Sequence, residues 1–375
     1  MAAAFAQPVD AMQRALQLAK RGLGRVEPNP PVGAVIVNAH GQLVGEGWHA
    51  RFGGPHAEVA ALAQAGERAR GATLYVTLEP CAHSGKTPPC APQVVAAGIR
   101  KVIVAAPDPA PHTSGRGLQQ LTDAGIDTEV GLLGEEAARL IAPFTKLMTR
   151  GLPWVHAKWA MTLDGKLATS TGDSKWISSE QSRQIVHELR GRMDAIVVGI
   201  GAALADDPQL TARPPGPRTP TRIVIDSQAR LPLDSHLVRT ARDVPVILAA
   251  AQQASADRCN QLRSAGVEVL QFDSGDATGV PLDQLLKSLG QRKLTNLLVE
   301  GGARLLGSFF DARFIDEVHA FIAPALAGGA NAPSPLAGKG IASMSDLLRL
   351  RNVELTHPGG DVYIHADIPT ETENA

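Results

Sequence analysis

The sequence contains little cysteine, few aromatic residues and no long apolar run. Three cysteines among 375 residues do not make a disulfide framework. No apolar run approaches the roughly 18 residues of a membrane span. The N-terminal stretch lacks the pattern of a secretory signal, because Asp10, Arg14 and Lys20 interrupt any apolar core. These absences predict a soluble cytoplasmic protein that has no membrane partner.

An excess of charge of one sign is also missing, both in the whole chain and in each half. Residues 1–150 carry 14 basic and 12 acidic side chains, residues 151–375 carry 22 and 25, and the net charge is −1. A nucleic-acid-binding surface normally requires a clear basic excess. The composition therefore predicts no nucleic-acid partner.

The chain does have enough apolar material for two cores. Hydrophobic residues make up 44% of the sequence, and the length suggests about two domains. Arg150-Gly151-Leu152-Pro153 is the predicted boundary, which divides the chain into domains 1–149 and 150–375. Strand-like and helix-like segments alternate in both parts, so we predict an α/β protein, with a largely parallel sheet in the second part.

These segments can be placed along the sequence. In the first domain we expect strands at 32–37, 43–48, 72–78, 101–105 and 126–130. Its expected helices are a first one ending at 22–24, then 56–69, 115–124 and a helical connection over 132–150. In the second domain we expect strands at 154–161, 195–198, 222–225, 244–249, 267–272 and 296–299, and a helix to Arg190 that Ser179 caps.

The stretch from His56 to Cys90 carries most of the chemistry. His56 and Glu58 open a helical segment, Cys81 follows the end of a strand, and Cys90 stands at a proline-flanked helix start. Imidazole and thiolate are zinc ligands, and a helix start favours a thiolate. A carboxylate that is not itself a ligand moves the protons in zinc deaminases. The stretch therefore predicts a zinc site of the deaminase kind.

Some alternatives stay open at this point. Both cysteines could instead be buried or form a local disulfide. Eight residues separate Cys81 from Cys90, unlike the short Pro-Cys-x-x-Cys motif of common deaminases, so we expect this loop also to line the substrate pocket. Asn29, in a proline-rich loop, either shapes a turn or presents its amide to a planar ligand.

Two glycine-containing stretches of the second domain are candidates for nucleotide binding. They are Gly199-Ile200-Gly201 and Glu300-Gly301-Gly302, and neither completes the Rossmann spacing. The second stretch follows a strand and opens a helix, where backbone N–H groups suit a phosphate. A close crossing of strand and helix would explain the same glycines.

Several motifs, in order, resemble the bifunctional deaminase/reductase family of riboflavin biosynthesis. The deaminase half is similar at 28–33 (PNPPVG), 56–58 (HAE) and 79–90 (EPCAHSGKTPPC). The reductase half is similar at 158–165 (KWAMTLDG), 174–177 (SKWI), 199–208 and 300–302 (EGG). The resemblance covers about residues 10–367. It implies an N-terminal three-layer domain like cytidine deaminase and a C-terminal α/β domain like dihydrofolate reductase.

The resemblance also implies two activities and their residues. The first is zinc-dependent loss of the 2-amino group of 2,5-diamino-6-(5-phosphoribosylamino)pyrimidin-4-one, with one zinc ion on His56, Cys81 and Cys90 and with Glu58 as proton shuttle. The second is reduction of the ribosyl chain to ribityl by NADPH, with Lys158 and Glu300 as catalytic candidates. The implied cofactor positions are Ala160, Trp176, Ala202, Asp206, Ser227, Gly302, Ala303, Arg304, Leu305, Leu306, Gly307 and Ser308. The implied substrate positions are Ser174, Arg190, Leu210, Arg213 and Glu300, to which we add Asn29.

The chain departs from the family pattern at Ala110, where Asn is usual, and at Ala202, where Thr is usual. Without the resemblance, Arg190 is typical of an exposed helix charge and Arg213 of a loop charge. We expect Trp48, Trp154 and Trp159 in the cores.

Two rival functions remain. One is a nucleoside or RNA deaminase with a non-catalytic nucleotide-binding appendage. The other is a binding protein whose reductase-like half senses a nucleotide without turnover. A homo-oligomer is expected only because the family often forms one.

Overall fold

The computed structural model describes residues 4–83, 85–110, 113–273, 275 and 279–369. Ser84 of the predicted cysteine motif lies outside the described residues. The chain divides into two compact units, Met1–Leu152 and Pro153–Ala375. Helix α6 (Ala142–Arg150) ends just before this division, where Gly151 adopts a left-handed φ of 66°. None of the described helices is long and apolar enough to cross a membrane.

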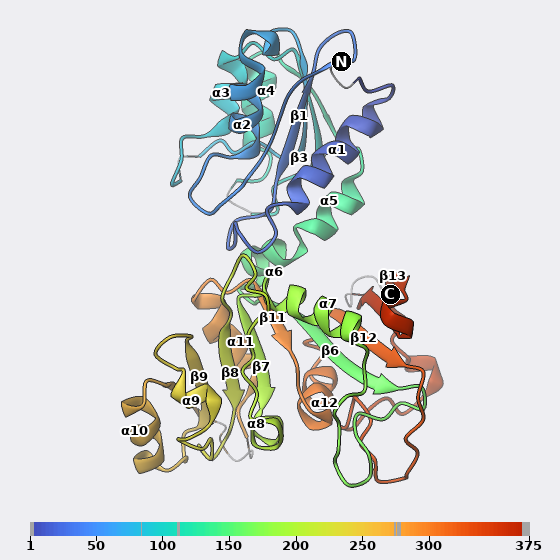
Figure 1. The fold of residues 1–375 in the computed structure, drawn as a ribbon. Coiled ribbons are helices and arrows are strands. Elements are labelled where there is room, and N and C mark those ends of the chain that lie inside the picture. Colours follow the sequence, from blue (N-terminus) through green and yellow to red (C-terminus); the bar gives the residue numbers. More distant parts are fainter. Residues whose placement is uncertain (1–3, 84, 111–112, 274, 276–278, 370–375) are drawn as a thin grey trace. The chain divides into compact units, whose positions relative to one another are not determined.

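The first unit contains, among its described residues, a five-stranded sheet in the order β2-β1-β3-β4-β5 (Figure 1). Strands β1 and β2, and β1 and β3, run antiparallel, whereas β3, β4 and β5 run parallel. The strands are β1 (Gly33–Val37), β2 (Leu43–Trp48), β3 (Thr73–Leu78), β4 (Lys101–Ala106) and β5 (Asp127–Val130). Each bound lies within one residue of its predicted position.

Helices cover both faces of this sheet. They are α1 (Pro8–Lys20), α2 (Ala57–Ala65) with the 3-10 turn η1 (Gly66–Ala69), α3 (Cys90–Ala96), α4 (Arg116–Asp123) and α5 (Gly134–Leu140). Figure 1 shows α1 and α5 on one face and α2, α3 and α4 on the other. A separate apolar core lies under each face. The first unit is therefore a three-layer α/β/α domain, as predicted.

The second unit contains a nine-stranded sheet within the part of the chain that the structure describes. Its order is β10-β9-β8-β7-β11-β6-β12-β14-β13, and only the pairs β12–β14 and β14–β13 are antiparallel. The strands are β6 (Trp154–Thr162), β7 (Ala195–Gly199), β8 (Thr221–Ile225), β9 (Val246–Ala251), β10 (Glu268–Phe272), β11 (Asn296–Val299), β12 (Glu317–Ala323), β13 (Arg351–Thr356) and β14 (Val362–Asp367). The largely parallel sheet was predicted, but β12, β13 and β14 were missed.

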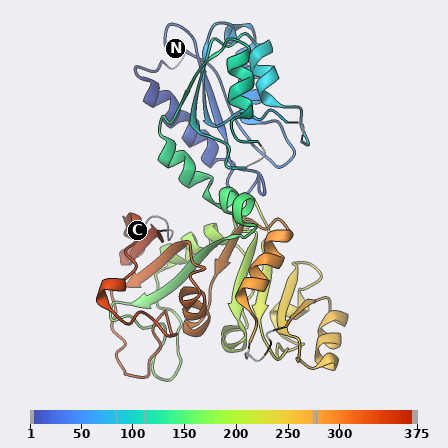
Figure 2. The ribbon, with the colours of Figure 1, turned by 180° about the vertical axis from the view of Figure 1, so that it is seen from behind.

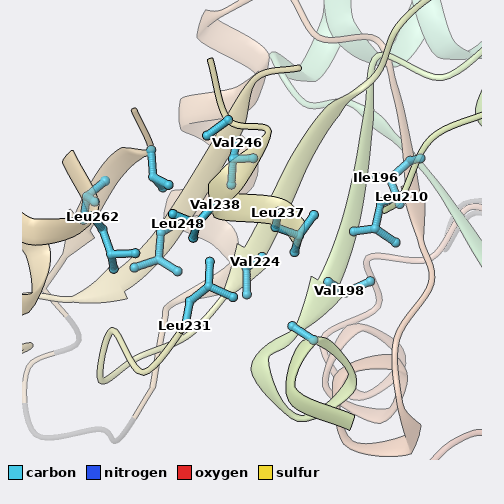
Figure 3. Close-up of a cluster of buried hydrophobic side chains, with 14 of the residues drawn as sticks. Ile196, Val198, Leu210, Val224, Leu231, Leu237, Val238, Val246, Leu248 and Leu262 are labelled. Atoms are coloured by element: carbon cyan, nitrogen blue, oxygen red, sulfur yellow. The ribbon is translucent and has the colours of Figure 1, made fainter. Parts of the chain in front are cut away.

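The helices of the second unit are α7 (Glu180–Arg190), α8 (Ile200–Asp206), α9 (His236–Arg239), α10 (Ala256–Ser264), α11 (Leu282–Gln291) and α12 (Ala303–Asp311), with the 3-10 turns η2 (Met344–Asp346) and η3 (Pro358–Gly360). The predicted cap of α7 is present, because Ser179 Oγ accepts a hydrogen bond from Ser182 N at 3.2 Å. Seen from behind in Figure 2, the orange helix α11 lies on one face of the sheet. Figure 3 shows one core, where Leu231 and Leu237 pack with Leu248 of β9 and Val224 of β8.

Candidate active sites

Three segments of the first unit bring a histidine and two cysteines together. His56 is the N-cap residue of α2, Cys81 follows β3, and Cys90 is the first residue of α3. His56 Nδ1 lies 3.6 Å from Cys81 Sγ and 3.2 Å from Cys90 Sγ. One ligand atom from each residue lies within 4.8 Å of the others. The fold therefore assembles the three predicted ligands, and this region can bind zinc.

The distances and the surroundings of this group fit a zinc ion. Tetrahedral zinc places a ligand nitrogen and a ligand sulfur about 3.5 Å apart, given the usual Zn–N and Zn–S bond lengths. Thr87 Oγ1 lies 3.3 Å from His56 Nε2, the ring nitrogen that faces away from the cysteines. Such a partner on the outer nitrogen fixes the ring of a metal-binding histidine. Two sulfurs and one nitrogen also leave a fourth position for water, as catalytic zinc sites do.

Glu79 holds the backbone next to the cysteine loop. Its buried carboxylate accepts four backbone hydrogen bonds of 2.9–3.2 Å, from Asp108, Gly115, Gly117 and Leu118. The carboxylate also lies at the positive end of the α4 dipole. A Cβ on Gly117 would lie 1.8 Å from Pro80 O, so only glycine allows α4 this close to the segment that leads into Cys81. From the sequence, Glu79 was recognised only as part of the motif at 79–90.

Glu58 lies beside the ligand group in the first turn of α2 and is only 3% exposed. Burial is the main reason that its pKa rises to about 7. A hydrogen bond with Cys90 lowers the pKa of Cys81 to about 4, and the same bond raises the pKa of Cys90. A carboxyl group that titrates near neutral pH can both accept and release a proton. Glu58 thus has the environment that its predicted role requires.

Asn29 is connected to the same site by His49, a residue for which no role was predicted from the sequence. His49 Nδ1 lies 3.0 Å from Pro55 O, which can only accept, so this nitrogen carries the hydrogen. Burial lowers the pKa of His49, and the neutral ring then accepts at Nε2 from the Asn29 amide at 3.2 Å. The His49 and His56 ring centroids are 5.3 Å apart. A single histidine after a strand has no sequence signal that would have indicated this contact.

The second unit contains a cavity of about 950 Å³. Twelve predicted site residues line it: Lys158, Ala160, Ser174, Trp176, Arg190, Ala202, Asp206, Leu210, Arg213, Glu300, Gly302 and Ala303. They come from β6, the loop after β6, α7, α8, the loop after α8, and the β11–α12 turn. The fold therefore brings together residues that are spread over most of the second unit's sequence.

A buried ion-pair group lies on the cavity wall. Arg190 Nε and Nη2 donate to the two Glu300 oxygens at 2.6 and 2.8 Å, and Lys158 Nζ lies 3.8 Å from Glu300. Burial favours a raised pKa for Glu300, but Arg190 and then Lys158 outweigh it and lower the pKa to about 2. Burial also lowers the pKa of Lys158, against the opposing effect of Glu300. Arg190 is not the exposed helix charge that its sequence context alone would suggest, because its side chain is only 15% exposed and pairs with Glu300.

The loop after α8 adopts unusual backbone conformations where it borders the cavity. Asp207 and Leu210 have φ values of 40° and 52°, in the left-handed region that is costly for residues other than glycine. Asp207 Oδ1 accepts from His236 N at 2.8 Å. Arg213, further along, is exposed and contacts Gln209 Oε1 at 2.9 Å. Such strained backbone often marks a ligand site.

The two glycines at the β11–α12 turn, Gly301 and Gly302, have different surroundings. A Cβ on Gly301 would lie 2.8 Å from a Leu305 methyl carbon, whereas a Cβ on Gly302 would meet nothing within 4 Å. Leu306 is fully buried and a Cβ on Gly307 would clash with Ala337 O at 1.9 Å. Ser227 and residues 304–308 do not line the cavity. Any cofactor contact from these α12 residues would therefore depend on the backbone at the helix start.

Trp159 was expected in the core but lines the cavity. Its Nε1 atom is buried and has no hydrogen-bond partner among the described residues. Lys175, Arg183 and His187 line the cavity as well, although no role was predicted for them from the sequence. The guanidinium of Arg183 lies 4.7 Å from the centre of the Trp176 ring.

Two family descriptions match the chain. Residues 153–364 match the RibD C-terminal domain, and residues 6–106 match the cytidine and deoxycytidylate deaminase zinc-binding region. The two predicted domain classes are thereby confirmed, and so is the zinc-binding deaminase region.

Relatives cover nearly the whole chain. The riboflavin biosynthesis protein RibD of Aquifex aeolicus (strain VF5) is 42% identical over 94% of this chain and 96% of its own length. The protein of the same name from Escherichia coli (strain K12) is 39% identical, over 94% and 97%.

Solved structures agree with these relatives. Acinetobacter baumannii RibD, form 1, superposes with a TM-score of 0.84 at 39% identity and covers 96% of this chain and 99% of its own. A diaminohydroxyphosphoribosylaminopyrimidine deaminase/5-amino-6-(5-phosphoribosylamino)uracil reductase from Thermotoga maritima has a TM-score of 0.81 at 35% identity, covering 96% and 98%. This chain therefore belongs to the RibD family of bifunctional deaminase/reductases of riboflavin biosynthesis.

Proposed function

We propose that residues 1–149 deaminate 2,5-diamino-6-(5-phosphoribosylamino)pyrimidin-4-one and that residues 150–375 then reduce its ribosyl chain to ribityl. The observation that carries this proposal is the His56–Cys81–Cys90 group beside a buried Glu58. Family membership supplies the second activity, and the cavity of the second unit offers a place for it.

In the deaminase half, His56, Cys81 and Cys90 would hold the zinc ion. When bound, zinc would supply a water of lowered pKa. Glu58 would accept a proton from the attacking water and deliver it to the leaving amino group, so that ammonia departs. Its raised pKa of about 7 suits both transfers. Asn29, held by His49, binds the edge of the planar pyrimidine through its remaining amide oxygen and hydrogen.

In the reductase half, the cavity volume of about 950 Å³ suits a large cofactor together with a small substrate. We propose that NADPH binds along Ala160, Trp176, Ala202, Asp206 and the α12 start (Gly302 and Ala303), which line the cavity. Ser227 and residues 304–308, which the resemblance also implies, lie outside the cavity lining. The helix starts of α8 and α12 lack side-chain caps, so their backbone N–H groups are available to phosphate oxygens. NADPH supplies a hydride when it is bound.

Lys158 and Glu300 handle the proton in this half. Lys158 donates a hydrogen bond to the ring oxygen of the ribose and releases a proton to it as the ring opens. Glu300 holds the Lys158 ammonium in position at 3.8 Å and is itself held by Arg190. Burial is the main cause of the lowered pKa of Lys158, and a lowered pKa makes the proton easier to release.

The phosphate group of the substrate needs cations and hydroxyl donors. We propose that Arg213 and Ser174 bind it, and that Leu210 shapes the cavity between them. Arg190 contributes the two guanidinium N–H groups that remain after its bonds to Glu300 and Thr211.

Mass analysis of the substrate after incubation with the full chain, zinc and NADPH tests the proposal. We expect exchange of one amino group for oxygen and a gain of two hydrogens when both cofactors are present. Without NADPH, only the exchange is expected. Absence of the exchange would refute the deaminase assignment, and absence of the hydrogen gain would refute the reductase assignment.

We also propose that the protein is a homo-oligomer. Strand β13 forms one edge of the nine-stranded sheet, and its Val353 and Leu355 side chains are 50% and 57% exposed. An exposed apolar edge strand is a template for pairing with another chain. Light scattering of the wild type and of Leu355→Lys should show a lower molar mass for the variant. A monomeric wild type would refute the proposal.

A further inference from the structure

A second cluster of metal-ligating side chains lies on the sheet of the C-terminal unit, apart from the cavity. It comprises His156 on β6 and Glu317 and His319 on the neighbouring strand β12. One ligand atom from each lies within 4.8 Å of the other two. The His156, Glu317 and His319 side chains are 8%, 15% and 3% exposed, so the cluster is largely shielded from solvent.

The distances within the cluster match those of a tetrahedral metal site. His319 Nε2 lies 3.4 Å from His156 Nδ1 and 3.1 Å from Glu317 Oε1. His156 Nδ1 lies 3.3 Å from Glu317 Oε2. Bonds of about 2.0–2.2 Å from zinc to nitrogen and oxygen place neighbouring ligand atoms about 3.3–3.5 Å apart. The two ring nitrogens thus lie 3.4 Å apart, and each lies 3.1–3.3 Å from one oxygen of the same carboxylate.

Each of the three side chains is also oriented by a partner on its far side. Asn296 Oδ1 lies 3.1 Å from His156 Nε2, and Tyr363 Oη lies 2.7 Å from His319 Nδ1. With its Nε2 hydrogen donated to Asn296, a neutral His156 presents its Nδ1 lone pair to the cluster.

Glu317 is held in the same way. Trp154 Nε1 donates to Oε2 at 2.9 Å, and His365 Nε2 lies 2.5 Å from Oε1. A carboxylate oxygen has two lone pairs, so one on each oxygen remains. Outer partners of this kind orient metal ligands and are typical of metal sites. The zinc group of the first unit shows the same arrangement, with Thr87 on the outer nitrogen of His56.

We propose that His156 Nδ1, His319 Nε2 and the Glu317 carboxylate bind a second divalent metal ion of the zinc class, with water as the fourth ligand. Two imidazoles and one carboxylate suit zinc and its neighbours among the first-row divalent metals. The site is structural, because none of its three ligands lines the cavity. The ion joins β6 to β12, and through Tyr363 and His365 it also orders β14 against them.

The test is the zinc content of the full chain, measured by mass spectrometry after dialysis against metal-free buffer. We expect two zinc ions per wild-type chain, and one in a Cys81→Ser/Cys90→Ser variant that lacks the deaminase ligands. His319→Gln in that background should leave none, whereas His357→Gln, which changes an exposed histidine, should still leave one. A cysteine variant that holds no zinc, beside a wild type that holds one, would overturn the proposal and leave the deaminase assignment intact.

A second measurement keeps the test valid if His319→Gln does not fold. Cobalt added to the cysteine variant should give the visible absorption of a tetrahedral nitrogen–oxygen site, and its titration gives a Kd. His365→Gln removes an outer partner only, and should raise this Kd by about 10- to 100-fold. An unchanged Kd in His365→Gln, or no cobalt absorption in the cysteine variant, would overturn the proposal.

Discussion

Replacing Glu300 by Gln removes the negative charge that neutralises two buried cations. Arg190 donates two hydrogen bonds of 2.6 and 2.8 Å to Glu300, and Lys158 lies 3.8 Å away. The lowering of the Glu300 pKa from 4.5 to about 2 corresponds to about 3 kcal/mol of stabilisation. Breaking a buried ion pair on one side typically costs 3–5 kcal/mol, which is of the same order. We therefore expect Glu300→Gln to lower the free energy of unfolding of this unit by about 3 kcal/mol.

Tryptophan fluorescence during urea unfolding measures this change, because Trp154, Trp159 and Trp176 all lie in the second unit. The thermal midpoint should fall by about 6–12 °C for a unit of this size. The chain offers a matched control in Glu268→Gln. Arg292 donates to Glu268 at 2.6 and 3.0 Å, but the two side chains are 37% and 49% exposed. An exposed pair of this geometry should contribute less than about 1 kcal/mol.

The stability of the wild type should also depend on pH in a defined direction. Because the pKa of Glu300 is lowered in the folded state, its stabilisation is complete above about pH 4.5 and is lost as the pH falls toward 2. The difference between the wild type and Glu300→Gln should shrink over this range. Equal costs for Glu300→Gln and Glu268→Gln at neutral pH, or a difference that does not depend on pH, would refute the reasoning.

Three further predictions concern the two sites. Glu58→Gln should retain the zinc of the deaminase site and lose deamination, while reduction of a pre-deaminated substrate continues; metal and mass analysis check this, and deamination above a few per cent of wild type would contradict it. Expressed separately, residues 1–149 should bind one zinc ion, and residues 150–375 should bind NADPH in a titration; insolubility of both fragments would argue for one continuous core. Ala202→Thr should tighten NADPH binding about two- to tenfold by adding one hydrogen bond worth about 0.5–1.5 kcal/mol, as calorimetry can measure. Weaker binding would mean that the added hydroxyl clashes or is buried unpaired.

The deaminase ligands could be predicted because their positions follow from local order along the chain. His56 is the N-cap residue of α2, and Cys81 and Cys90 lie at the two ends of one loop between β3 and α3. Cys81 O accepts backbone hydrogen bonds from Cys90 N and Ala91 N at 3.0 and 3.1 Å, so the two ends of the loop stay together near the end of β3. The one non-local feature that had to be inferred was that the start of α2, with His56, lies close to the end of β3. His49 was missed because its role depends on a contact with Asn29, 20 residues earlier.

The reductase residues could be placed only through the family resemblance. Arg190 and Glu300 are separated by 110 residues, and nothing local in α7 indicates that the guanidinium is buried. Burial follows from the sheet order, which puts β11 between β7 and β6 and so brings Glu300, directly after β11, into reach of α7 and Lys158. Propensity and periodicity contain no information about that order. Trp159 was assigned to the core because a large apolar residue on a strand is typical of a core. The sheet order, which places it at the cavity, could not be read from the sequence.

Strand β12 shows why a polar pattern can hide both a strand and a site. Glu317 and His319 occupy alternate positions, so they face the same side of the sheet. Read along the chain alone, such a polar pair weakens the strand signal of an otherwise apolar segment (317–323), and β12 was missed. The parallel register with β6 places His156 opposite Glu317, and the antiparallel register with β14 places His365 opposite His319. The neighbouring strands thus convert a polar face into a buried cluster of histidines around one carboxylate. A buried carboxylate is stable only when it is paired, and the two imidazoles that supply the pairing are also the groups that bind a divalent metal.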